Sequence, residues 1–200
     1  MIDVILFDLF GVIARDQSAE GRERLVATAG VPAQEFWESY WALRPPYDRG
    51  EVAGPAYWRQ VAEKLGTSFD DQRIADLIAA DIASWSAVDD DMVRLVGQLS
   101  AEGRRLALLS NIPEELARHY DQQLDQFAVR AFSCRIGHAK PGRAAYLWCC
   151  DALDVDPGRV LFVDDRAENV VAAEEVGMRG HLFTGLDVLS QLICSGLGPH

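Results

Sequence analysis

The stretch that decides the fold reads Val4-Ile5-Leu6-Phe7-Asp8-Leu9-Phe10-Gly11-Val12. A short apolar run that ends at Asp and Gly is typical of a buried strand that enters a tight loop. In parallel α/β sheets, ligands bind in the crevice beyond the carboxyl ends of the strands. Because Asp and Gly are also common in turns, this stretch alone permits either an ordinary turn or a functional carboxylate at Asp8.

The composition limits the classes of function. The chain has 200 residues, 49% of them hydrophobic, and a formal net charge of −12. Such a chain suits one domain, or one domain with an insert. The negative charge argues against nucleic acid and against an anionic membrane as partners, because both require a basic face. A small anionic substrate stays possible if local Lys, Arg or a metal ion offsets the overall field.

Two further features indicate a cytoplasmic protein. No apolar stretch approaches the ~20 residues needed to span a bilayer, and no basic segment precedes an apolar run at the N-terminus. The four cysteines, Cys134, Cys149, Cys150 and Cys194, show neither metal-ligand spacing nor a disulfide framework. We therefore expect reduced thiols.

Strand-like and helix-like patterns alternate along most of the chain. The strand-like runs are Val4–Phe7, Leu106–Leu109, Ala131–Ser133, Val160–Val163 and His181–Phe183. Apolar residues at helical spacing lie between the later runs, for example in the segment 92–99. This alternation predicts an α/β protein with a doubly wound, Rossmann-like parallel sheet.

A long helical insert separates the first strand from the second. Helical spacing is seen for Phe36, Trp37, Tyr40 and Trp41, and again in the segments 57–65 and 74–82. We expect a helical cap at residues 15–86, inserted into a core formed by residues 1–14 and 87–200. The aromatic side chains of the insert are predicted to form the core of the cap or its contact with the sheet.

Polar residues of interest follow the second strand, and another precedes a helix. Ser110 and Asn111 end the second strand, where Ser110 could cap a helix or hold a ligand. Lys140 stands before Pro141, which favours an extended or turn conformation and marks a helix start. A lysine fixed there can reach an anion at the sheet edge as a point charge, although a lone lysine is often a solvated surface residue.

The fourth segment carries two adjacent carboxylates at a strand end. Asp164 and Asp165 follow the apolar run Val160–Val163 and precede Arg166. Two acidic groups at one buried strand end repel each other unless a cation compensates. Arg166 and capping of the next helix could provide this, and so could Mg²⁺, which accepts carboxylates, waters and phosphate oxygens.

Taken together and in this order, the four segments resemble the haloacid dehalogenase superfamily over nearly the whole chain. The pattern of that superfamily is matched by Asp8, Ser110, Lys140 and the pair Asp164-Asp165. The insert is similar to the helical cap of its first cap class, the subfamily IA type. The motifs are most similar to those of alpha-D-glucose-1-phosphate phosphatase and of the phosphatase domain of soluble epoxide hydrolase.

The resemblance implies a magnesium-dependent phosphomonoesterase that acts on small phosphorylated metabolites, as a monomer or homodimer. Asp8 would be the nucleophile and form an aspartyl-phosphate. Mg²⁺ would be held by Asp8, the backbone carbonyl of Phe10 and Asp165, with Asp164 assisting directly or through water. The implied substrate contacts are Ser110, Asn111, Lys140 and, from the cap, Arg49. The cap segment Arg44–Gly50 is predicted to be a loop that selects the substrate.

One position departs from the phosphatase pattern. Phosphatases of the superfamily usually carry a second Asp two residues after the nucleophile, as general acid and base, and here that residue is Phe10. Another residue could supply the proton; the candidates are His138, Tyr47, Asp48 and Arg49.

Two other functions remain open at this point. A 2-haloacid dehalogenase often has an aromatic residue at this position and needs no metal, and Arg44 or Arg49 could then hold a substrate carboxylate. A phospho-ligand-binding protein with little turnover would also keep these motifs. The acidic pair Asp164-Asp165 favours the phosphatase over the dehalogenase.

Overall fold

The computed structural model describes residues 2–196, with side chains as far as Ile193. Within them, five parallel strands form one sheet in the order β3-β2-β1-β4-β5. The strands are β1 (Val4–Phe7), β2 (Arg105–Ser110), β3 (Val129–Phe132), β4 (Val160–Asp164) and β5 (Arg179–Leu182). The central position of β1 between β2 and β4 confirms the predicted doubly wound parallel sheet.

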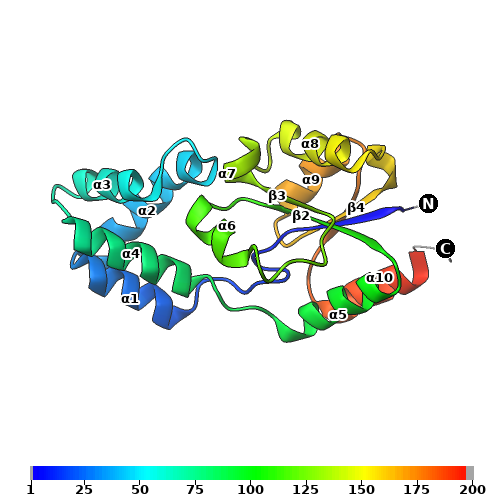
Figure 1. Ribbon diagram of the computed structural model, residues 1–200, viewed down its shortest axis with the longest axis horizontal. Helices are drawn as coiled ribbons and strands as arrows, with labels where there is room; N and C mark the ends of the chain where they lie inside the picture. The colour runs from blue at the N-terminus through cyan, green and yellow to red at the C-terminus, as the bar shows by residue number, and fades with distance from the viewer. Residues whose placement is uncertain (1, 197–200) are drawn as a thin grey trace.

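Helices cover both faces of this sheet (Figure 1). On one face lie α5 (Asp90–Ala101) and α10 (Leu186–Gly196), and on the other lie α8 (Arg143–Leu153) and α9 (Ala167–Glu175). The remaining short elements of the core are α6 (Glu114–Tyr120), α7 (Ser133–Ile136) and the 3-10 helix η1 (Pro157–Arg159). The result is a three-layer α/β/α core.

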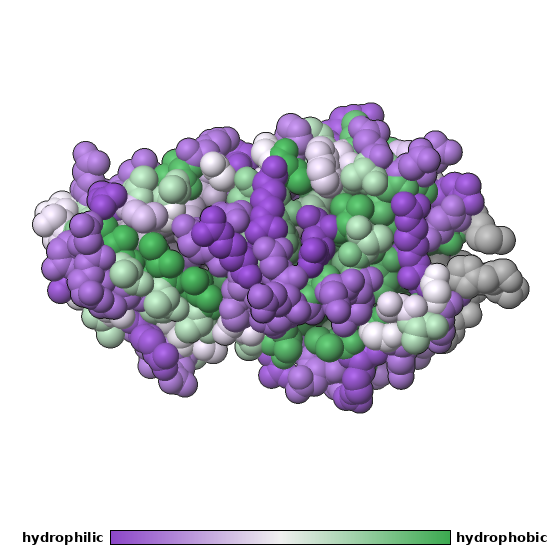
Figure 2. Space-filling model, in the orientation of Figure 1, coloured by the Kyte–Doolittle hydropathy of each residue, from purple (hydrophilic) through white to green (hydrophobic). Residues whose placement is uncertain are grey.

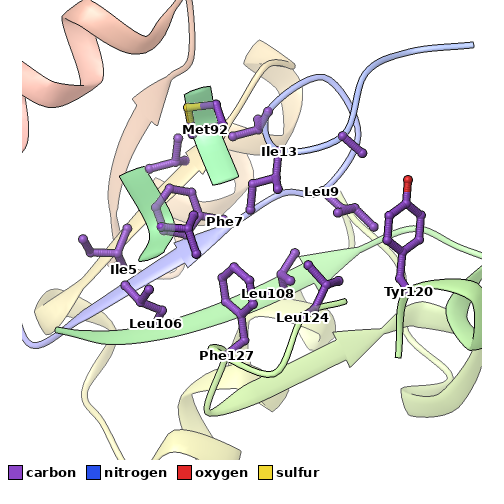
Figure 3. Packing of buried hydrophobic residues seen from close by; sticks show 14 of the residues in the cluster. Ile5, Phe7, Leu9, Ile13, Met92, Leu106, Leu108, Tyr120, Leu124 and Phe127 are labelled. Atoms are coloured by element: carbon purple, nitrogen blue, oxygen red, sulfur yellow. The ribbon is translucent and has the colours of Figure 1, made fainter. Parts of the chain in front are cut away.

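Side chains alternate along β1 between the two faces. Ile5 and Phe7 pack with Met92 of α5 in one cluster (Figure 3). Val4 and Leu6 belong to the cluster on the side of α8 and α9. All four β1 side chains are at most 2% exposed, and burying each one stabilises the fold by about 1.5–3 kcal/mol. Because both faces are covered, β1 is a continuous apolar run rather than an alternating one.

Four of the five strands differ from their predicted bounds, and for two of them the structure shows the reason. The run Ala131–Ser133 is a strand only as far as Phe132, and Ser133 begins α7. The Ser133 hydroxyl accepts a hydrogen bond from the Ile112 backbone N–H and donates one to the Asp48 carbonyl, which fixes it in the loop region. The last strand begins at Arg179 rather than at His181, because the backbone of Arg179 already pairs with β4. Arg179 is charged, so the pattern of apolar residues in the sequence does not mark it as part of a strand.

Helices α1 to α4 form a second body beside the sheet, at the left of Figure 1. Their bounds are α1 (Ala19–Ala29), α2 (Ala33–Asp48), α3 (Gly54–Lys64) and α4 (Asp71–Ser84). They enclose their own cluster of buried residues, in which Phe36, Tyr40, Tyr57 and Trp58 are fully buried. Most aromatic residues of the insert therefore make a core, although Trp41 is exposed, and the division at residues 14/15 and 86/87 stays a prediction.

The chain passes between the sheet and the helical body twice, near residues 14–15 and again near residues 87–88. These two connecting segments, the first and second crossings, run side by side. Ala14 and Val88 form an antiparallel bridge, and the Arg15 backbone N–H donates to the Ala87 carbonyl at 2.8 Å. Since the first crossing follows β1 directly, this bridge holds α1–α4 next to the carboxyl end of the sheet. A second tie comes from Glu115 of α6, whose carboxylate accepts hydrogen bonds from the Tyr47 hydroxyl and the Gly54 N–H.

The prediction of a loop at Arg44–Gly50 is wrong. Helix α2 continues through Pro45 and Pro46 to Asp48. Two buried side chains hold this segment in a helix: Tyr47 stacks on Tyr57 with ring centroids 4.3 Å apart, and the Arg44 guanidinium lies inside the helical body. Tertiary packing here outweighs the two prolines, which taken alone predict a helix end.

Three observations concern membrane-spanning helices, the surface and the cysteines. No helix among the described residues is long and apolar enough to cross a membrane. Figure 2 shows a surface dominated by hydrophilic residues with apolar patches between them. Cys134, Cys149 and Cys150 form no disulfide among the described residues, and the reduced state stays a prediction. The side chain of Cys194 lies outside the described residues.

Arg44 offers a test of how the helical body is stabilised. Its guanidinium is 2.8 Å from Asp48 and 3.0 Å from Asp81, and both ion pairs are almost fully buried. Replacing Arg44→Met leaves two buried carboxylates without a counter-charge and should lower the free energy of unfolding by about 3–5 kcal/mol. Urea denaturation followed by circular dichroism measures this loss.

The matched control is Arg24→Met. Arg24 pairs with Glu20 at 2.8 Å on the surface, where both side chains are more than half exposed. Removing an exposed pair should cost less than about 1 kcal/mol. Equal losses in the two variants would show that the buried pairs do not stabilise the helical body.

Candidate active site

Three carboxylates meet at the carboxyl edge of the sheet. Asp8 follows β1, Asp164 ends β4 and Asp165 comes directly after it. Since β1 and β4 are parallel neighbours, their ends lie at the same edge, and carboxylate oxygens of the three residues lie within 4.8 Å of one another. Asp8 and Asp164 are buried, whereas Asp165 is partly open to solvent.

Lys140 lies between two of these carboxylates. Its Nζ is 2.7 Å from Asp8 Oδ1 and 2.7 Å from Asp164 Oδ2, and its side chain is only 2% exposed. The side chain of Asn111 holds the Lys140 backbone: its Oδ1 accepts from the Lys140 N–H and its Nδ2 donates to the Lys140 carbonyl, each at 2.8 Å. The loop after β2 thus positions the lysine that precedes α8.

The hydrogen bonds distinguish Asp164 from Asp8. Both oxygens of Asp164 accept from the Asn169 amide at 3.0 Å, and Oδ1 also accepts from the Arg166 N–H at 2.8 Å. Asp164 is therefore saturated and anchors Lys140. Among the described residues, the contacts to the Asp8 carboxylate all go to Oδ1, from Lys140 and from the Leu9 N–H. Oδ2 of Asp8 has no partner there and is available to react.

The site carries an excess of negative charge. Burial raises the pKa of Asp8 to about 7, an effect that Lys140 opposes and Asp164 increases. Burial also raises the pKa of Asp165, with further contributions from the nearby charges of Asp164 and Asp16. Three carboxylates share one ammonium group, so a bound cation would relieve their repulsion.

Gly11 allows Asp165 to approach the loop that follows Asp8. The backbone of Gly11 has φ +79°, and a Cβ built there would lie 2.3 Å from Asp165 Oδ2. A residue with a side chain would be strained by this φ value and would displace the carboxylate. The glycine seen in the opening stretch of sequence is thus required for the acidic cluster.

A cavity of about 460 Å³ opens onto this cluster. Its lining combines core residues with residues of the helical body and the first crossing: Asp8, Phe10, Asp16, Gln17, Arg22, Trp41, Trp85, Asn111, Lys140, Asp165, Arg166 and Asn169. The ring of Phe10 lies against Trp85, with centroids 4.8 Å apart, and against Tyr120 at 5.9 Å. The cavity is therefore polar at the sheet edge and aromatic toward the helices.

The structure brings together most of the residues selected from the sequence. Asp8, Phe10, Asn111, Lys140 and Asp165 line the cavity. Asp164 lies behind Lys140 and is fully buried. Ser110 is also buried, its Oγ has no hydrogen-bond partner among the described residues, and it caps no helix, since Pro113 precedes α6.

The residues expected from the cap are placed differently. Arg49 does not line the cavity at Asp8; it borders a neighbouring cavity of about 360 Å³ and pairs with Glu51 at 2.6 Å. Arg44 is occupied by its buried ion pairs. Of the proton donors considered for the Phe10 position, Tyr47 donates to Glu115, Asp48 pairs with Arg44 and His138 is exposed; none lines the cavity at Asp8.

Several lining residues carried little signal in the sequence. They are Asp16, Gln17, Arg22, Trp41, Trp85, Arg166 and Asn169. Arg166 and Asn169 could be found because they lie in the motif around Asp164-Asp165. The others belong to the first crossing and the helical body, whose contacts with the sheet edge depend on how the chain folds back.

Comparison with known proteins identifies the class. The family model of haloacid dehalogenase-like hydrolases matches residues 2–177, so the chain belongs to this family of hydrolases. The sesquiterpene phosphatase astK of Aspergillus oryzae is 25% identical over 195 residues, which cover 94% of this chain and 93% of that protein. Flavin mononucleotide hydrolase 1 of Arabidopsis thaliana is 26% identical over 199 residues, covering 95% and 76%.

Solved structures of the family share the fold. A HAD family enzyme from Bacteroides thetaiotaomicron, in complex with magnesium and inorganic phosphate, aligns with a TM-score of 0.76 and 20% identity, covering 90% of this chain and 93% of that one. An L-2-haloacid dehalogenase from Xanthobacter autotrophicus, with chloropropionic acid covalently bound, aligns with a TM-score of 0.63 and 19% identity, covering 100% and 85%. At these identities the likeness establishes the fold.

Gly11→Ala tests the close approach of Asp165. The left-handed conformation with a side chain and the contact with Asp165 should lower the free energy of unfolding by at least about 1–2 kcal/mol. The control is Gly97→Ala in α5, where a Cβ meets no atom within 4 Å. This change should stabilise the protein by roughly 0.5–1 kcal/mol. If urea denaturation gave both variants the same sign, Gly11 would not be required by its surroundings.

Proposed function

We propose that this hydrolase is a magnesium-dependent phosphomonoesterase of small phosphorylated metabolites, with Asp8 as its nucleophile. The observation that carries the proposal is the free Oδ2 of Asp8 beside a fixed ammonium and a second carboxylate, at the bottom of a cavity. The two relatives that match most of the chain are a phosphatase and a nucleotide hydrolase, which supports the same reaction class.

The donor set fits Mg²⁺. Asp8, Asp165 and the backbone carbonyl of Phe10 would hold the ion, because oxygen donors of this kind suit a hard divalent cation. Asp164 is taken up by Lys140 and Asn169, so we assign it to holding the lysine and supporting the site. When bound, Mg²⁺ supplies positive charge that lets an anionic phosphate approach a carboxylate.

The side chains account for two chemical steps. Asp8 Oδ2 attacks phosphorus, the bond from phosphorus to the ester oxygen breaks, and the alcohol leaves as its alkoxide, which takes up a proton. Water then attacks phosphorus of the aspartyl-phosphate, releasing inorganic phosphate and the Asp8 carboxylate. Lys140 neutralises charge on the transferring group throughout, and Asn111 and Asp164 keep its ammonium in place.

Because of Phe10, the attack of Asp8 on phosphorus has no general acid at the usual position. The Phe10 ring packs against Trp85 and Tyr120, so the position that carries an acid in related phosphatases is apolar here. General acid–base assistance is usually worth ~10²–10⁴ in rate. The site therefore favours leaving groups that need little protonation, or takes the proton from another group that lines the cavity.

A second candidate is a 2-haloacid dehalogenase, which the aromatic residue at Phe10 favours, because halide leaves without a proton. A carboxylate substrate, however, would enter a site where three carboxylates share Lys140. Arg44, the buried arginine considered for holding it, is already paired with Asp48 and Asp81. A phosphatase that binds a cation fits this excess of negative charge better than a dehalogenase that works without a metal ion.

One experiment separates the alternatives. The purified protein is assayed with Mg²⁺ and with EDTA on p-nitrophenyl phosphate, a panel of sugar phosphates, and 2-chloropropionate with halide detection. We expect phosphate release that requires Mg²⁺ and no halide release. Halide release that is insensitive to EDTA would establish the dehalogenase instead. If neither product formed, a protein that binds phosphorylated ligands without turnover would become the better interpretation.

Asp8→Asn tests the covalent step. It removes the nucleophile with almost no change in shape, so phosphate release should fall by about four orders of magnitude or more while the protein stays folded. Phosphate release is measured in the steady state, and folding by circular dichroism. Substantial turnover by a folded Asp8→Asn protein would exclude an aspartyl-phosphate at this residue.

Phe10→Asp tests the missing acid, with Phe10→Asn as the variant that loses the same ring without gaining a proton donor. Relative to Phe10→Asn, Phe10→Asp should raise kcat/KM for glycerol 3-phosphate by roughly ten- to a hundredfold and leave p-nitrophenyl phosphate little changed, because only the alkoxide needs protonation. The same change for both esters would mean that proton donation does not limit the rate.

A further inference from the structure

Three aromatic side chains line the same cavity as the nucleophile and form an aromatic wall. It consists of Phe10 from the loop after β1, Trp41 of α2 and Trp85 at the end of α4. The centroid of Trp85 lies 4.8 Å from that of Phe10 and 6.3 Å from that of Trp41, where the rings meet edge to face. Three segments far apart in sequence thus place aromatic rings beside the reactive carboxylate.

Trp41 is not required for the core of the helical body. Its side chain is 48% exposed, whereas Phe36, Tyr40 and Trp58 of the same body are fully buried. It borders both the cavity at Asp8 and the neighbouring cavity of about 360 Å³, and Asn111 and Lys140 line both as well. A large exposed aromatic side chain next to a cavity is typical of a binding surface.

Trp85 is held rigidly. Its Nε1 donates to the Tyr40 hydroxyl at 3.2 Å, and that hydroxyl donates to buried Asp81 at 2.7 Å. The Trp85 carbonyl accepts a hydrogen bond from Tyr120. Because the indole N–H is already bonded inside the protein, what Trp85 offers a ligand is ring surface, fixed before binding.

We infer that the substrate is a phosphate monoester whose leaving group is an aromatic or similarly apolar group, bound against Trp41 and Trp85. This rests on the proposed phosphatase function: Lys140 and Asp8 take the phosphoryl group, and the aromatic wall takes the part attached to the ester oxygen. A sugar would require partners for several hydroxyls, and this wall presents mainly ring surface, since the Trp85 N–H is bonded to Tyr40.

The test compares benzyl phosphate, glycerol 3-phosphate and glucose 6-phosphate. All three release a primary alkoxide, so the chemistry of the leaving oxygen is matched and the group beside it differs. We expect the wild-type protein to have the highest kcat/KM for benzyl phosphate. Trp41→Ala should lower that value by about 3- to 10-fold, the range for losing one aromatic contact, and should lower the value for glycerol 3-phosphate less. Trp41→Phe should restore most of the loss.

Trp37→Ala is the matched control on the same helix. Trp37 packs on Phe36 and Tyr40 and does not line the cavity at Asp8, so the ratio of the two kcat/KM values should stay as in the wild type. Equal losses of Trp41→Ala on benzyl and glycerol phosphates, or a wild-type preference for glycerol 3-phosphate or glucose 6-phosphate, would overturn the inference.

A binding measurement separates this inference from the proposed function. Calorimetry with benzylphosphonate, which is not hydrolysed, is carried out on the wild type and on Trp41→Ala with Mg²⁺ present. Weaker binding to Trp41→Ala supports the aromatic wall even if no ester is hydrolysed, in which case only the phosphatase proposal fails. Unchanged binding contradicts the aromatic wall even if phosphate release is confirmed.

Discussion

The ammonium group of Lys140 is the interaction on which the site depends. It stands 2.7 Å from Asp8 and 2.7 Å from Asp164, at the ends of the adjacent strands β1 and β4. Two buried carboxylates so close together would repel each other strongly without it. The lysine is in turn fixed by the loop after β2, where Asn111 bonds both its N–H and its carbonyl. Lys140, which precedes α8, thereby holds the ends of β1, β2 and β4 together. The Asp8 oxygen that Lys140 does not contact stays without a partner among the described residues.

The position of the helical body follows from the same sheet edge. Its first crossing begins only a few residues after Asp8, and the Ala14–Val88 bridge binds the outgoing and returning chains together. On the far side, Glu115 accepts hydrogen bonds from Tyr47 and from the Gly54 N–H. Held at both ends, the helices α1–α4 form a wall of the cavity, so its lining combines core residues such as Asp8 and Lys140 with residues of the insert such as Trp41 and Trp85.

The sequence was sufficient for what depends on local pattern. Apolar runs located all five strands. The polar residues that follow two of them supplied Asp8 and Asp165, because the ends of parallel strands must converge, and Lys140 was found before Pro141 and the start of a helix. The prediction failed at Arg44–Gly50, where two prolines indicated a loop but burial of Arg44 and Tyr47 retains the helix. It also could not find Trp41 or Trp85, since their nearness to Asp8 depends on how the helical body packs against the sheet. Packing between distant segments leaves no periodic signal in the chain.

Phe10 links the proposed chemistry of the site with its proposed selectivity. No proton donor stands at its position, and its ring lies against Trp85, which meets Trp41 edge to face. A carboxylate in its place would face the rings of Trp85 and Tyr120 without a counter-charge and would add a fourth negative group to a cluster that shares one ammonium. The aromatic surroundings thus favour an apolar residue at this position through packing alone. A phosphate ester of a phenol would fit both features of the site. Its leaving oxygen needs little protonation, and its ring can pack against the aromatic wall.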